Sequence, residues 1–197
     1  KDENLIQVYE AISSHNETKF DGLISTLRAN VNQKNYIASP DNFINDIFPI
    51  MEKSEDRHRS KLIRVLDEAL KNEDIYISFV KVDGSTSLAH LLEQRTEETS
   101  RAFFHFMENH RQFDMFPIPI IRTLLSFYDY PNIKIRSRAL KILFFVCEQQ
   151  RTFLCSVPTF IAHMLDFTQF QLQENLLETL LNTILDLLSG IDTLPDS

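Results

Sequence analysis

Glycine and tryptophan are scarce in this chain of 197 residues, which holds three glycines and no tryptophan. Hairpin turns and phosphate-binding loops both rely on glycine, because it adopts positive φ angles without steric cost. The sequence therefore disfavours a sheet fold rich in hairpins and a glycine-rich nucleotide site. Hydrophobic residues make up 43% of the chain and charged residues 24%, as is typical of folded globular proteins. We expect an all-α fold.

An excess of basic residues is also absent, since the formal net charge is -8 and the pI is near 5.2. Neutralisation of phosphates by Lys and Arg supplies most of the affinity for nucleic acid, so a nucleic-acid partner is disfavoured. No apolar run approaches the roughly 20 residues that span a bilayer, and we expect no transmembrane segment. The start at Lys1, without a signal peptide, suggests a fragment of a larger protein.

Cysteine is rare as well. Cys147 and Cys155 do not form a C-x-x-C pair, and both occupy positions where a helical pattern places small buried residues. We interpret them as free buried thiols of a protein in a reducing compartment. The expected location is the cytoplasm, with the nucleus as the alternative.

One pattern recurs along the chain at steps of 40, 37 and 37 residues, with Ser60, Ser100, Ser137 and Glu174 as equivalent positions. Each full copy has a polar residue, a serine and a basic residue, then two apolar residues and a third apolar residue three positions later. Full copies lie at 59–66, 99–106 and 136–143, a copy without the serine at 173–180, and a weaker copy around 23–27.

A shorter apolar segment precedes each copy, and polar breaks separate the two. The breaks lie at 40–42, 83–85, 130–132 and 157–159. Each unit is therefore predicted to contain a shorter helix and a longer helix whose apolar residues recur at i, i+3/i+4 and i+7. Such a helix pair cannot bury its apolar stripe alone, so units of this kind stack on one another.

The residues of one unit resemble an armadillo repeat. Phe79–Gly84, followed by Leu88, Leu91 and Leu92, is similar to the glycine turn and second helix of that family, and Thr99–Met107 is similar to its third helix. The resemblance covers roughly residues 40–190. It implies a right-handed α-solenoid of about five armadillo/HEAT-like repeats in a single domain, with units near 1–38, 39–72, 73–113, 114–151 and 152–190.

The face of each longer helix opposite its apolar stripe is the candidate binding surface. In armadillo proteins the equivalent positions line the concave groove that receives partners. A rotation of about 100° per residue places the following residues there: Lys61, Arg64, Glu68, Arg101, Phe104, Glu108, Arg138, Lys141, Phe145, Asn175, Glu178 and Asn182.

This stripe is basic in its first three units although the chain is acidic, and it contains two phenylalanines. The first interpretation is that the basic residues attract an acidic or phosphorylated partner and that Phe104 and Phe145 anchor it. The alternative is that the charges only keep an amphipathic helix soluble and that both rings are buried against a neighbouring helix.

One departure from the family concerns the asparagine that importins and catenins use to bind peptide backbone. The equivalent positions here are Glu68, Glu108, Phe145 and Asn182, so one of four fits. The chain also lacks the tryptophans of nuclear-signal readers. A nuclear import receptor is therefore disfavoured.

Catalytic patterns are missing from the sequence. His105 and His110 are five residues apart, which does not place both on one helix face, and adjacent Glu97 and Glu98 would point about 100° apart. No nucleophile elbow, zinc spacing or phosphate loop occurs. We expect neither an enzyme nor a cofactor, a metal or a small-molecule substrate.

The sequence therefore predicts a non-catalytic interaction module, a scaffold or regulatory domain that binds a helix or extended segment of another protein. The alternative is an architectural segment that mediates self-association within a larger assembly.

Overall fold

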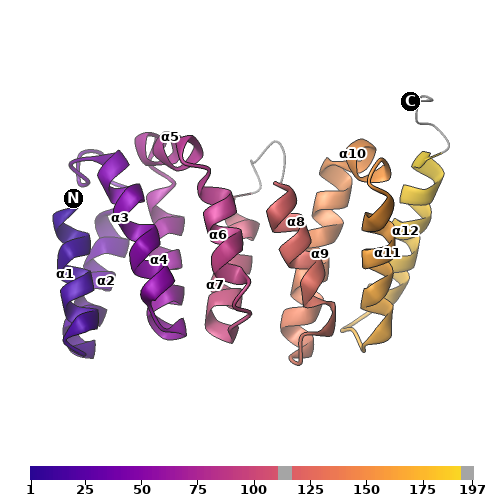
Figure 1. The fold of residues 1–197 in the computed structure, drawn as a ribbon, viewed down its shortest axis with the longest axis horizontal. Helices are drawn as coiled ribbons and strands as arrows, with labels where there is room; N and C mark the ends of the chain where they lie inside the picture. The colour runs from indigo at the N-terminus through magenta and orange to yellow at the C-terminus, as the bar shows by residue number, and fades with distance from the viewer. Residues whose placement is uncertain (111–116, 192–197) are drawn as a thin grey trace. The chain divides into compact units, whose positions relative to one another are not determined.

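We describe the protein from a computed structural model, which covers residues 1–110 and 117–191 (Figure 1). Those residues form twelve α-helices and two short 3-10 helices and contain no strand. The all-α prediction is confirmed. The chain divides into two compact units, Lys1–Asn109 and His110–Ser197, and each is described by itself.

Unit 1 begins at the N-terminus and contains seven helices. They are α1 (Glu3–Ser13), α2 (Glu17–Asn30), α3 (Pro40–Lys53), α4 (Asp56–Ala69), α5 (Glu73–Lys81), α6 (Gly84–Leu92) and α7 (Glu97–Asn109).

Several of these helices begin where a short polar side chain caps the first turn. The side chains of Asp2, Asn16, Ser39 and Asn72 each accept a hydrogen bond from a backbone N–H of the helix that follows. Such a cap stabilises a helix by about 1 kcal/mol, because it pairs an N–H that has no partner inside the helix. Helix α3 begins at Pro40, whose missing N–H has no cost at that position.

The turn between α5 and α6 needs its glycine because of a close approach. Asp83 has a φ of 51°, in the left-handed region, and Gly84 is the first residue of α6. A Cβ atom on Gly84 would lie 2.3 Å from two ring carbons of Phe79, the buried aromatic residue at the end of α5. A larger residue at position 84 would therefore displace that ring from the core.

Helix α4 lies at the centre of unit 1, between α2 and α7 (Figure 1). Its most extensive packing is with α7, and it also packs against α2 and α3. Packing on several sides buries polar as well as apolar residues of α4. The buried residues are His58, Arg59, Ser60, Leu62, Ile63, Val65, Leu66, Asp67 and Ala69.

Two polar residues at the start of α4 fix the neighbouring helices. The carboxylate of Asp56 accepts hydrogen bonds from the backbone N–H groups of Glu98 (3.1 Å) and Thr99 (2.8 Å), and from the Thr99 hydroxyl (2.6 Å). It therefore caps α7 from another helix. Arg59 is buried and donates from Nε to the Met51 carbonyl (3.0 Å) and from Nη2 to the Ser54 carbonyl (2.5 Å). It therefore ties α4 to two backbone carbonyls at the end of α3, of which that of Met51 also accepts from the Ser54 N–H at 3.3 Å.

The described residues of unit 2 form five α-helices and both 3-10 helices. They are α8 (Ile118–Leu125), η1 (Ser126–Asp129), α9 (Ile133–Gln149), α10 (Arg151–Cys155), α11 (Pro158–Asp166), η2 (Phe167–Gln169) and α12 (Leu176–Ile191).

A buried arginine joins the helices of unit 2, as Arg59 does in unit 1. Arg136 of α9 donates from Nη1 to the Tyr130 carbonyl (2.5 Å) and from Nε to the Gln171 carbonyl (3.1 Å). The neighbouring Ser137 hydroxyl accepts a hydrogen bond from the Gln173 backbone N–H (3.1 Å). The arginine of the recurring pattern is therefore buried against backbone carbonyls in both copies, whereas the Ser60 hydroxyl donates within its own helix, to the Arg57 carbonyl.

Among the helices within residues 1–110 and 117–191, none has the length and apolar character that a membrane crossing requires.

Substitution of the buried arginine of α4 tests this role. Arg59→Leu should lower the free energy of unfolding by about 2–3 kcal/mol, because two carbonyls lose a charged donor. Arg64→Leu on the same helix is the control and should change it by less than about 0.5 kcal/mol, since its guanidinium is partly exposed and contacts no buried carbonyl. Urea denaturation measures both. Equal denaturation midpoints for the two variants would contradict the assigned role.

Candidate partner-binding groove

Unit 1 contains an open groove of about 840 Å³ that α2, α4 and α7 line together. We refer to it as the α2–α4–α7 groove. Its walls carry charged side chains of both signs, and its volume suits a segment of polypeptide better than a single small ion. The lining residues are Asp21, Ile24, Ser25, Arg28 and Ala29 of α2, Ser60, Lys61, Arg64 and Glu68 of α4, and Glu98 and Arg101 of α7.

The floor of the groove is the one line of α4 that its neighbours leave accessible. Arg57, Lys61, Arg64 and Glu68 are partly exposed, and they follow one another at steps of four, three and four residues. Residues at these steps share one face of a helix. Because α2, α3 and α7 cover the other sides, the sequence of α4 places these four side chains in a single row.

Four residues of the predicted stripe come together in this groove: Lys61, Arg64, Glu68 and Arg101. Glu108 is half-buried on α7 and is not among the lining residues. The predicted stripe therefore matches the accessible face of α4, and on α7 it includes the accessible residue Arg101.

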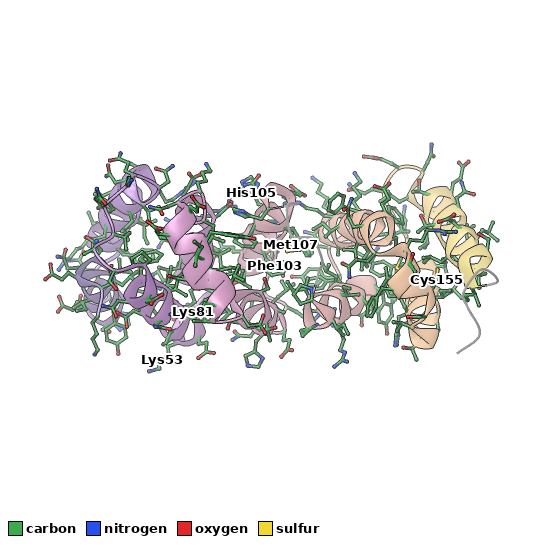
Figure 2. The ribbon with its side chains drawn as sticks, turned by 90° about the horizontal axis from the view of Figure 1, so that it is seen from above. Lys53, Lys81, Phe103, His105, Met107 and Cys155 are labelled. Carbon is green, nitrogen blue, oxygen red and sulfur yellow. The ribbon has the colours of Figure 1, made fainter. Side chains whose placement is uncertain are left out.

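Of the two interpretations of Phe104, the structure supports burial of its ring. Its side chain is 0% exposed, and its ring meets that of Phe103 edge-on with the centroids 6.2 Å apart. The line that remains accessible on α7 consists of Arg101, His105 and Glu108, so His105 takes the place expected for Phe104. Figure 2 shows His105 at the edge of unit 1, with Phe103 and Met107 inside it. The buried side of α7 includes position 104, whereas the equivalent residue of α4, Arg64, is partly exposed.

The other predicted residues belong to unit 2 and lie on the open sides of their helices. On α9, Arg138 and Phe145 are half-buried and Lys141 is exposed, with its Nζ 3.6 Å from Glu174. Glu178 and Asn182 on α12 are exposed, as is Asn175 just before that helix.

Asp21 is the hub of an ion-pair network along one wall of the groove. Lys61 Nζ donates to its Oδ1 at 2.6 Å, and Arg57 Nη2 donates to both of its oxygens at 2.9 Å. The hydrogen bond from Lys61 is the main reason that the pKa of Asp21 lies below its usual value, and Arg57 acts in the same direction. Glu17, one turn earlier, pairs with Arg57 and lies 2.8 Å from His58 Nε2. These contacts hold α2 beside α4.

Two further charged side chains of the groove form ion pairs with residues of their own helix or of the segment just after it. Arg101 Nη2 donates to Glu97 at 2.6 Å, and the Glu68 carboxylate accepts from Lys71 at 2.7 Å. The charges at this part of the wall are therefore largely neutralised before any ligand arrives.

Arg28 and Arg64 differ from these residues. Within residues 1–110 and 117–191, neither guanidinium has a hydrogen-bond partner or a carboxylate within ion-pair distance. Both line the same groove, one from α2 and one from α4. Two unpaired positive charges in one concave site favour an anionic ligand.

Sequence reasoning missed the contribution of α2. The weak first copy of the recurring pattern, at Leu23, Ile24 and Leu27, contains the signal that could have found it. The stripe positions extended to that copy are Gly22, Ser25 and Ala29, and the last two line the groove. Arg28 lies beside them and has no equivalent basic residue in the later copies.

Both cysteines are buried and free, as predicted. Burial raises the pKa of the Cys147 thiol to about 12, so it is not ionised near neutral pH and is a poor nucleophile. Among the residues that the structure describes, no group of three or more His, Cys, Asp or Glu side chains is arranged to hold a metal ion.

Comparison of the chain with protein families, with curated proteins and with solved structures found no match in any of the three. The function is therefore argued from the α2–α4–α7 groove and the helix faces.

Truncation of Phe104 tests its reassignment to the core. Phe104→Ala should cost about 3–5 kcal/mol of unfolding free energy, because it leaves a cavity where a buried ring was. His105→Ala, on the accessible line of the same helix, should cost less than about 1 kcal/mol. Thermal and urea unfolding of the two variants measure the difference. If the Phe104→Ala protein is as stable as the His105→Ala protein, Phe104 is not a core residue and its ring is exposed.

Proposed function

We propose that this chain is a non-enzymatic scaffold of the armadillo/HEAT type, a right-handed α-solenoid of about five helical units that binds a segment of a partner protein in the cytoplasm. The α2–α4–α7 groove is the binding surface. The observation that carries the proposal is a concave site of about 840 Å³ whose unpaired basic side chains lie on an acidic chain.

Support for the repeat architecture comes from equivalent residues with equivalent contacts. Arg59 and Arg136 occupy the same position of the recurring pattern, and both are buried and donate to backbone carbonyls. Ala102 and Ala139 share the next apolar position and are both buried. A repeat unit explains why two segments 77 residues apart in the sequence bury the same residue types at equivalent positions.

Support for a protein partner comes from the electrostatics of the groove. The chain as a whole carries a net charge of -8, so most proteins with an acidic surface are repelled. A segment with acidic or phosphorylated side chains is attracted locally by Arg28 and Arg64, the groove arginines without an acidic partner among the described residues. Such complementarity raises the association rate and selects the partner more than it adds affinity.

Charge reversal within the groove tests this function. The double variant Arg64→Glu and Arg101→Glu should bind a fluorescein-labelled pool of acidic peptides at least about tenfold more weakly than the unmodified protein, because both the attraction and the steering are reversed. Fluorescence anisotropy at a fixed salt concentration measures the affinity, and thermal unfolding checks that the fold is intact.

The matched control is Arg122→Glu on α8, which makes the same kind of charge change at an exposed position outside the groove. It should leave binding unchanged. Binding by the double variant that equals binding by the control would show that the groove does not receive the peptide.

The second candidate function, self-association within a larger assembly, is favoured by the outer face of α12. Five large apolar side chains lie exposed on that helix at the spacing of one face, and Leu185 among them is 63% exposed. At the position equivalent to Leu177, Ile63 of α4 and Leu140 of α9 are fully buried. An apolar helix face of this kind marks a contact surface. The exposed residues are Leu177, Leu181, Leu185, Leu188 and Ile191.

Sedimentation velocity tests this second function. If the α12 face pairs with that of a second copy, the sedimentation coefficient should rise with protein concentration. The double variant Leu181→Glu and Leu185→Glu should then remain a monomer, because each charge would be desolvated in the pair. Ile77→Glu on α5, also at an exposed apolar position, should behave like the unmodified protein. A monomer at every concentration would rule the function out.

A further inference from the structure

Arg28 of α2 and Arg64 of α4 both line the α2–α4–α7 groove. The Asp21–Lys61 ion pair aligns the two helices at 2.6 Å. Arg28 lies seven residues after Asp21 and Arg64 lies three residues after Lys61, so the two are offset by about 6 Å along the helices, and Glu68 is the residue of α4 level with Arg28. Ser25, between Asp21 and Arg28 on α2, lines the groove as well. We call Ser25, Arg28 and Arg64 the anion site.

The other basic side chains of the groove, Lys61 and Arg101, have acidic partners, so the anion site is where positive charge remains, although the acidic Glu98 also lines the groove. Lys61 is engaged by Asp21 and Arg101 by Glu97, and the nearest acid on α4, Glu68, is engaged by Lys71. Neither Arg28 nor Arg64 has a carboxylate within ion-pair distance anywhere in the part of the chain that the structure describes.

We propose that the anion site binds the phosphoryl group of a phosphorylated serine or threonine in the partner segment. This inference rests on the proposed function of the α2–α4–α7 groove and names the chemistry that the groove recognises. Two guanidinium groups on two helices present a set of N–H donors to one ligand, and the Ser25 hydroxyl adds another.

The charge count favours a phosphoryl group over a carboxylate. A phosphorylated side chain carries close to two negative charges near pH 7 and three acceptor oxygens, which balances two guanidinium groups, whereas a carboxylate balances one. Arginine also suits phosphate better than lysine does, because its planar fork donates two parallel hydrogen bonds.

The position of the anion site and the net charge of the chain favour a peptide over a lipid headgroup as the source of the phosphoryl group. The site lies within a groove between helices, and the net charge of -8 opposes approach of the chain to an anionic membrane surface. A flexible segment of a partner protein can enter such a groove without bringing a charged surface with it.

Three labelled peptide pools that differ only in their central residue test the proposal. The central residue is phosphoserine, glutamate or serine, and the flanking positions are the same degenerate mixture in each pool. By fluorescence anisotropy, the phosphoserine pool should bind at least about tenfold more tightly than the glutamate pool. Arg28→Gln and Arg64→Gln should each weaken phosphoserine binding by about tenfold or more, as the loss of a charged hydrogen bond does.

Arg122→Gln is the matched control, and its phosphoserine preference should equal that of the unmodified protein. The preference should also fall when the pH is lowered through about 6, where a phosphate monoester gains its second proton. The glutamate pool should bind equally on both sides of that pH, because glutamate titrates near 4.3.

The results distinguish the phosphoryl preference of the anion site from the proposed function of the α2–α4–α7 groove. Equal binding of the phosphoserine and glutamate pools, with loss in the Arg64→Glu and Arg101→Glu protein, would overturn the phosphoryl preference and leave the groove function standing. Failure of all three pools to bind would overturn both. Binding to phosphatidylcholine vesicles that contain a phosphoinositide, without binding to the phosphoserine pool, would overturn the choice of a peptide ligand.

Discussion

Helix α4 is packed by α2, α3 and α7, and this packing decides where unit 1 can be functional. Nine of its side chains are buried, including the polar groups of Arg59 and Asp67. An amphipathic helix in this position has one accessible line left, and on α4 that line carries Lys61 and Arg64. The floor of the α2–α4–α7 groove is thus a consequence of the core and needs no separate element to form it. The same core keeps the groove walls apart at a fixed separation.

The polar contacts of unit 1 divide into those that hold the walls and those that are left for a ligand. Asp56 fixes the start of α7, Arg59 fixes the end of α3, and the Asp21 network joins α2 to α4. These contacts hold the walls in place before a partner arrives, so binding loses less conformational freedom. Arg28 and Arg64 are left as the positive charges of an ordered site.

The sequence predicts the fold class and the open face of α4 well, because both follow from the 3.6-residue period of apolar side chains. It predicts the line on α7 less well. Whether Phe104 is buried depends on how many neighbours surround α7, and the periodicity of a single helix does not contain that information. The contacts between Asp56 and Thr99 and between Asp21 and Lys61 join residues about 40 positions apart, so no local pattern could have revealed them. Arg28 lines the groove from α2, and no local pattern in the sequence places it there.

The most direct measurement of the central claim follows the arginine side chains while a ligand binds. In an NMR titration of the isotope-labelled chain with the phosphoserine peptide pool, the Nε–Hε signals of Arg28 and Arg64 should shift together and saturate at one ligand concentration. The signal of Arg122 should stay in place. Coincident shifts at Arg28 and Arg64 would place the ligand in the α2–α4–α7 groove, beside the accessible face of α4. A titration that moves Arg122 and leaves Arg28 and Arg64 unchanged would contradict the account.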